Sequence, residues 1–152
     1  QAESTNQVAA KTAWSVFVDN NPTECFAVAV PQSTVNTRGG RTVDVRRSEI
    51  LLFTVYRPSA NARGQLSFTG GYPFAPGSKV TIQVGGSSYS MTTDGEWAWP
   101  ENPEDDPKIV AAMKRGNTAV VTGRSARGTT TKDTFSLMGY TAAVDDAARR
   151  CG

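Results

Sequence analysis

Short stretches of the chain alternate between apolar and polar residues, and this period of two is typical of half-buried β-strands. In residues 80–84, for example, three aliphatic side chains alternate with Thr81 and Gln83. Residues 50–56 are apolar almost throughout, which favours a central strand buried on both faces. The pattern predicts strands at 14–18, 25–30, 50–56, 65–69, 80–84, 89–92, 97–99, 118–123 and 129–137.

Glycine and proline mark the turns between these strands. Gly85-Gly86 predicts a hairpin between the strands at 80–84 and 89–92, and Arg127-Gly128 predicts a second one. The polar segment 31–48 offers only Val43 and Val45 as a short edge strand.

The period changes to that of a helix twice in the second half of the chain. In Asp105-Asp106-Pro107 an aspartate supplies the N-cap of a helix and proline suits its first turn. Basic residues follow in the last turn, and Gly116 suits its end. A helix is therefore predicted near residues 106–115. The apolar positions Tyr140, Ala143, Val144, Ala147 and Ala148 predict another at 140–150.

Composition agrees with a fold built mainly from strands. The 152 residues suit one domain, and 15 Val against 4 Leu and 3 Ile, with 18 Thr, favour β-structure. We expect a loose N-terminus over 1–12 and a single β-rich domain over 13–152. The predicted fold is an antiparallel β-sandwich or partly closed barrel, with one short internal helix and a C-terminal helix.

The two cysteines, Cys25 and Cys151, lie near opposite ends of the predicted domain. A disulfide would tie the C-terminal helix to an early strand, whereas two buried free thiols are the alternative. The even count and small-domain composition favour the disulfide.

The absence of histidine excludes Ser-His-Asp and Cys-His catalysis and all His-ligated metal sites. A formal net charge of +2 gives no reason to expect a nucleic-acid partner. The acidic run from Glu101 to Asp106 fits a helix start better than a calcium loop. Ser125 and Lys132 match no hydrolase motif. We therefore expect no metal, no cofactor and no enzymatic activity.

Two groups of side chains are candidates for binding. Arginine suits anion recognition, and aromatic side chains on loops suit a sugar or peptide platform, although both types also serve structure. The arginine candidates are Arg38, Arg41, Arg46 and Arg47, and the aromatic candidates are Tyr72, Phe74, Trp97 and Trp99.

Several segments together resemble the invasion-associated locus B family of bacterial envelope proteins. The most specific is FSLMGYTAA at residues 135–143, which follows the helical segment AAMKRG at 111–116. Trp14, Cys25 and Cys151 add to the likeness, which spans roughly residues 13–151. The positions that match the family suggest structural roles. Gly139 lets the chain leave the last strand, and Ala142 and Ala143 bring the final helix close to the sheet. Phe135 and Leu137 are expected in the core.

The resemblance implies a small exported protein of Gram-negative bacteria, located in the periplasm or outer envelope, with its signal peptide removed. It links the founding member to host-cell invasion and defines no enzymatic activity. Many members carry a second cysteine pair, which the segment 89–99 lacks here. We expect no transmembrane segment, and we expect an envelope or host protein as partner.

Three hypotheses for function follow. The first is a non-enzymatic binding or interaction module. The second is a carboxylate-based enzyme on envelope glycans, for which Glu49, Asp94 and Glu96 are candidates and a cleft between two carboxylates is required. The third is a structural or chaperone-like periplasmic protein that pairs through a long sheet edge.

Overall fold

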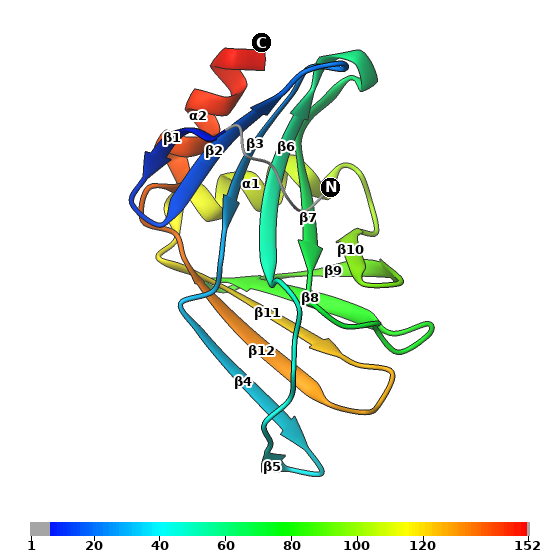
Figure 1. The fold of residues 1–152 in the computed structure, drawn as a ribbon. Helices are drawn as coiled ribbons and strands as arrows, with labels where there is room; N and C mark the ends of the chain where they lie inside the picture. The colour runs from blue at the N-terminus through cyan, green and yellow to red at the C-terminus, as the bar shows by residue number, and fades with distance from the viewer. Residues whose placement is uncertain (1–6, 152) are drawn as a thin grey trace.

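In the computed structural model, which describes residues 7–151, twelve strands form one antiparallel sheet that is not closed. The sheet bends sharply, so the two groups of strands run at a steep angle to each other (Figure 1). The first half-sheet contains, in spatial order, β1 (Gln7–Lys11), β2 (Trp14–Asp19), β3 (Glu24–Ala29), β6 (Leu51–Arg57) and β7 (Ala62–Thr69). The second contains β10 (Trp97–Pro100), β9 (Ser87–Asp94), β8 (Lys79–Val84), β11 (Thr118–Arg124), β12 (Thr130–Ser136), β4 (Ser33–Arg38) and β5 (Arg41–Thr42).

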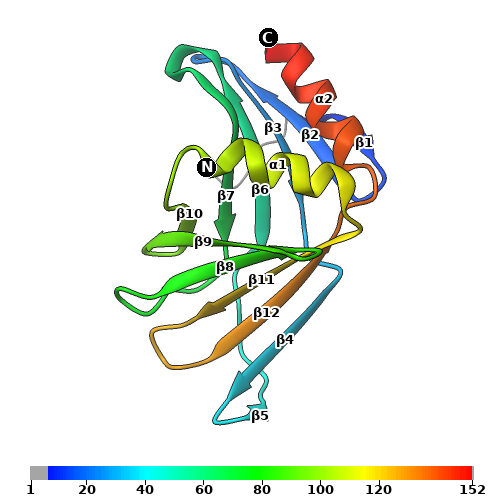
Figure 2. The same ribbon diagram turned by 180° about the vertical axis from the view of Figure 1, so that it is seen from behind.

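Both α-helices cover the same face of the first half-sheet (Figure 2). The helix α1 (Asp105–Arg115) packs mainly on β7, and α2 (Tyr140–Cys151) packs on β2 and β3. A short 3-10 helix, η1 (Pro58–Ala60), joins β6 to β7. The predicted mostly β fold with one internal and one C-terminal helix is therefore confirmed.

The main core lies between this covered face and the inner face of the second half-sheet. Phe68 of β7 meets Phe135 of β12 edge to face, with ring centroids 6.2 Å apart. Tyr140 is fully buried and shares a hydrogen bond of 2.8 Å with Thr54 of β6. The Trp14 indole N–H donates to the carbonyl of Ser136 at 2.9 Å. These partners explain how polar groups are accommodated in the core.

The predicted disulfide between Cys25 and Cys151 is present and joins β3 to the end of α2. It closes a separation of 126 residues. Gly139 has φ of +88°, and a Cβ there would lie 1.8 Å from the carbonyl oxygen of Lys11. Phe135, Leu137 and Ala143 are buried as predicted, but Ala142 is exposed and does not bring α2 close to the sheet.

Three local expectations are wrong. Residues 7–11 form the edge strand β1 rather than a loose terminus, because their backbone pairs with β2; residues 1–6 lie outside the described part of the chain. The edge strand expected at Val43 and Val45 lies earlier, in β4 and β5, because Gly39-Gly40 makes the hairpin turn. Edge strands need little apolar alternation, so the pattern missed both.

The third concerns the start of α1. Glu104 occupies the N-cap position without a side-chain cap hydrogen bond. The carboxylate of Asp106 instead accepts a hydrogen bond of 3.0 Å from the backbone N–H of Leu66. Asp106 therefore fixes α1 to β7 rather than capping its own helix.

Candidate functional site

A row of aromatic side chains crosses the outer face of the first half-sheet, opposite the helices, and ends on β10, the neighbouring strand of the second half-sheet. It contains Phe17 of β2, Phe26 of β3, Phe53 of β6 and Trp97 of β10. Successive ring centroids are 5.5, 5.6 and 5.8 Å apart. Such spacings are those of interacting aromatic pairs, so the four rings form one continuous row.

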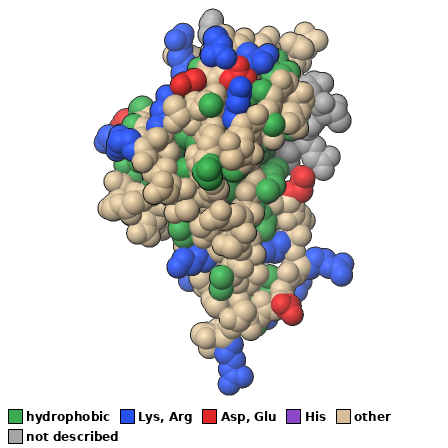
Figure 3. Space-filling model, turned by 90° about the vertical axis from the view of Figure 1, so that its left-hand side faces the viewer, with side chains coloured by type: hydrophobic (Ala, Val, Ile, Leu, Met, Phe, Trp, Pro, Cys, Tyr) green, Lys and Arg blue, Asp and Glu red, His purple; other side chains and the backbone are tan. Residues whose placement is uncertain are grey.

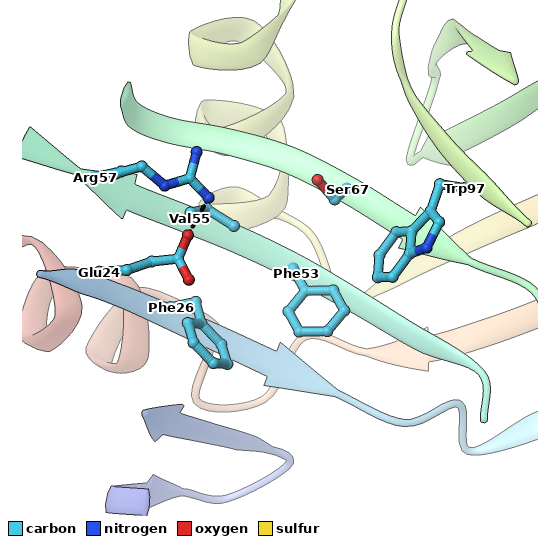
Figure 4. A pocket seen from close by; sticks show the side chains of 7 residues that line it. All are labelled: Glu24, Phe26, Phe53, Val55, Arg57, Ser67 and Trp97. Carbon is cyan, nitrogen blue, oxygen red and sulfur yellow. Dashed lines mark hydrogen bonds and ion pairs between the residues drawn. The ribbon is translucent and has the colours of Figure 1, made fainter. Parts of the chain in front are cut away.

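A small hollow of about 90 Å³ opens beside this row (Figure 4). Phe26, Phe53, Val55 and Trp97 give it apolar walls, and the hydroxyl-bearing Ser67 lies toward the Trp97 end. An ion pair between Glu24 and Arg57 forms the other end of the hollow. Glu24 is the more buried partner, with 15% of its side chain exposed against 37% for Arg57.

A second, larger hollow of about 320 Å³ adjoins the first, because Ser67 lines both. Trp99 and Pro103 line it, and Trp99 is 41% exposed. Asp106 lies at its side. Burial raises the pKa of the Asp106 carboxyl; the hydrogen bond from Leu66 opposes this, and nearby Asp105 adds to it.

The sequence was compared with models of known protein families. The model described as "Invasion associated locus B (IalB) protein" matches residues 14–148. The chain belongs to this family. Neither the search of curated proteins nor the search of solved structures returned a significant match.

In this invasion-associated locus B protein, the aromatic candidates divide between core and surface. Tyr72 and Phe74 are buried, with centroids 5.0 Å apart, and the Tyr72 hydroxyl bonds to Thr131. They cover the inner face of the second half-sheet and form no platform there. Trp97 lines the smaller hollow on the outer face, and Trp99 lines the larger hollow between β7, β10 and the start of α1.

The sequence reasoning missed Phe17, Phe26 and Phe53 as site residues. A signal was present in β2, where Phe17 alternates with Val16 and Val18 and so points to the opposite face. Only the successive pairing of five strands, β2, β3, β6, β7 and β10, shows that these rings join Trp97.

The arginine candidates do not converge on one site. Arg47 is inside the protein, where Nη1 and Nη2 donate to the Asp133 carboxylate at 2.7 and 2.8 Å. Arg38 donates to Thr129 Oγ1 at 2.7 and 3.1 Å, while Arg41 and Arg46 are exposed. The view in Figure 3 likewise shows basic side chains spread over the surface and not gathered in one patch.

The structure also locates the residues and strands on which the enzymatic and the chaperone-like hypotheses depend. Glu49, Asp94 and Glu96 are all exposed at the surface. Ser125 stabilises the β11–β12 turn, where its Oγ accepts from the N–H groups of Arg127 and Thr129. The edge strands of the described sheet are short, with five residues in β1 and two in β5.

Within residues 7–151 no group of acidic or cysteine side chains is arranged to hold a metal ion. Neither helix of that part of the chain is long and apolar enough to cross a membrane.

Proposed function

We propose that this protein is an exported, non-enzymatic binding module and that its two adjoining hollows hold an extended segment of a partner protein. The observation that carries this proposal is the aromatic row with hollows on either side of Ser67. The partner's chemistry follows from the size and the rim of these hollows.

The smaller hollow suits one aliphatic side chain. Its volume of about 90 Å³ corresponds to roughly three water molecules of liquid, far below the ~300 Å³ at which ligand pockets begin. Phe26 and Phe53 are each only 3% exposed, so a sugar ring would find no open ring face on them. A side chain inserted into the hollow would instead bury apolar surface mainly against Val55 and Trp97, which are partly exposed.

The rim of the hollows supplies polar groups for a peptide backbone. The Glu24–Arg57 pair flanks one end, and Gln65 and Asp106 flank the other. An extended segment has unpaired N–H and C=O groups that need such partners. At protein interfaces, the residues that contribute most to binding typically fill apolar pockets that are surrounded by a polar rim.

Export is supported by the disulfide and by the family. Disulfides persist mainly in oxidising compartments, and Cys25–Cys151 joins two distant parts of the fold. We propose that the protein resides in the periplasm or outer envelope, and a role in host-cell invasion is part of the same proposal.

The test uses Ser67→Trp, which fills the space where the hollows meet. Peptides are selected from a random phage-displayed library on the purified protein, and their affinities are measured by fluorescence anisotropy. We expect peptides with alternating apolar residues, and at least tenfold weaker binding to Ser67→Trp.

The matched control is Thr134→Trp, at another half-buried strand position, on β12. It should bind the selected peptides like the wild type. Equal losses in both variants, no selected peptide, or Trp97-dependent binding of glycans instead would contradict the proposal.

A further inference from the structure

The larger hollow contains a carboxylate that no cation of the described chain neutralises. Asp106 lines this hollow of about 320 Å³, and no lysine or arginine is among the lining residues, which all lie within the described chain. Within residues 7–151 its carboxylate makes no ion pair and accepts one hydrogen bond, at Oδ1, from the N–H of Leu66. A carboxylate has about four acceptor positions, so Oδ2 can accept from a further donor.

The lysines on either side of the Asp106 turn are paired with other acids. Lys108 Nζ lies 3.9 Å from the Asp105 carboxylate, and Lys79 Nζ lies 2.6 Å from that of Glu101. The first turn of α1 favours an acidic residue, but its partial charge of about +0.5 offsets only part of a full negative charge. The hollow therefore keeps a negative charge at its wall.

Trp99 adds an aromatic wall to the same hollow. It is 41% exposed, whereas its neighbours in β10, Ala98 and Pro100, are buried. A cation over an indole ring is attracted to the negative face of the ring. An apolar side chain would suit this hollow less well, because it would remove water from the Asp106 carboxylate without giving it a new hydrogen bond.

We propose that the larger hollow binds an arginine side chain of the partner segment, between the Asp106 carboxylate and the Trp99 ring. A guanidinium stacks on aromatic rings and carries five N–H donors, enough for Asp106 and for the side-chain oxygen of Gln65, which also lines the hollow. This inference rests on the proposed peptide-binding function and names the residue that the second hollow selects.

The position of the arginine in the partner follows from the adjoining hollows, which meet at Ser67. In an extended segment, side chains an even number of positions apart point the same way. We therefore expect the selected peptides to carry arginine two or four positions from the apolar residue that fills the smaller hollow.

The test measures binding of Nα-acetyl-arginine methylamide by NMR chemical-shift changes. The citrulline compound is the comparison probe, because it has nearly the same shape without the charge. We expect shifts at the amides of Leu66 and Ser67 and at the Trp99 indole, with at least fivefold tighter binding of the arginine compound. Asp106→Asn should abolish this preference while its side-chain oxygen still accepts from Leu66, and Trp99→Leu should weaken arginine binding at least threefold.

The matched control is Glu104→Gln, which removes a negative charge from an exposed residue of the same acidic run that does not line the hollow. It should change the affinity less than twofold. An arginine compound that binds no better than citrulline, or equal losses in Glu104→Gln and Asp106→Asn, would overturn the proposal. Peptide binding that is still weakened by Ser67→Trp would then leave the proposed function standing, whereas arginine binding without any selected peptide would count against that function alone.

Discussion

At the scale of single residues, the ion pair between Arg47 and Asp133 is the most consequential contact. Their side chains are 6% and 0% exposed. Arg47 also donates to the carbonyl of Gly70 at 2.9 Å and lies 5.1 Å from the ring centroid of Tyr72. One guanidinium thus joins β12 to the loop after β7, and it satisfies a carboxylate that has no access to water.

We predict that Arg47→Met lowers the free energy of unfolding by about 3–5 kcal/mol, because it leaves the buried carboxylate of Asp133 without its cation. Urea denaturation monitored by circular dichroism measures the loss. The double variant Arg47→Met/Asp133→Leu should recover most of it.

Lys79→Met is the control for Arg47→Met. Its ion pair with Glu101 is exposed, at 51% and 36% of the two side chains, so its removal should cost less than about 1 kcal/mol. Similar losses of stability in Lys79→Met and Arg47→Met would show that burial of the Arg47–Asp133 pair does not increase the cost of breaking it.

At the scale of elements, the junction between β12 and α2 depends on Gly139. Its φ is +88°, and its missing Cβ makes room for the carbonyl of Lys11 next to β2. The same residue therefore allows both the turn into α2 and the close passage of the β1–β2 hairpin.

We predict that Gly139→Ala destabilises the protein by more than about 3 kcal/mol, since it adds a steric clash to the left-handed strain of about 1–2 kcal/mol. Gly128→Ala is a matched control, because Gly128 has the same φ of +88° with no atom within 4 Å of the added Cβ. Thermal denaturation of both variants separates the cost of the clash with Lys11 from the cost of the left-handed backbone strain. Equal destabilisation would mean that the contact with Lys11 is unimportant.

The packing of α1 on β7 should depend on pH through Asp106. Because burial raises its folded-state pKa, the folded protein binds this proton more tightly than the unfolded chain. The carboxyl's stabilising contribution is therefore complete below the unfolded pKa of about 3.9 and is lost as the pH rises through the folded-state pKa.

Asp106→Asn should remove this dependence while its side-chain oxygen still accepts from Leu66. Urea denaturation across this pH window should show wild-type stability falling relative to the variant, by less than about 1 kcal/mol because Asp106 is partly exposed to solvent. If the difference in stability between wild type and Asp106→Asn does not change with pH, the titration of Asp106 does not cause the predicted pH dependence.

At the scale of the whole molecule, the two half-sheets are joined by few backbone contacts. The pairing of β7 with β10 covers only two residue pairs, Thr69 with Trp97 and Phe68 with Ala98. The halves are held together mainly by core side chains such as Phe68 and Phe135. Links between distant parts of the chain, including the disulfide, therefore matter more than local ones.

We predict that Cys25→Ala/Cys151→Ala lowers the free energy of unfolding by about 5 kcal/mol, from the entropy of the 126-residue loop that it opens. Guanidinium denaturation with and without reductant measures it. Reductant should destabilise the wild type and leave the double variant unchanged. Wild-type stability that resists full reduction, verified by thiol titration, would contradict this prediction.

The sequence by itself determined most of the local structure. The alternation in 80–84, the hairpin turns and the change to a helical period predicted nearly every interior strand and both helices. Patterning predicts these well because each buried strand or helix must present an apolar face. The cysteine pairing was also predicted, because only two cysteines are available.

The tertiary structure alone decided which residues share a surface. Trp97 was predicted as a binding residue, but its neighbours Phe17, Phe26 and Phe53 were identified only through strand pairing. Tyr72 and Arg47 are of residue types common at binding surfaces, and both were predicted to bind a ligand, yet both lie inside the protein. The period of a strand tells which residues alternate, whereas which face is covered depends on elements that are distant in the chain.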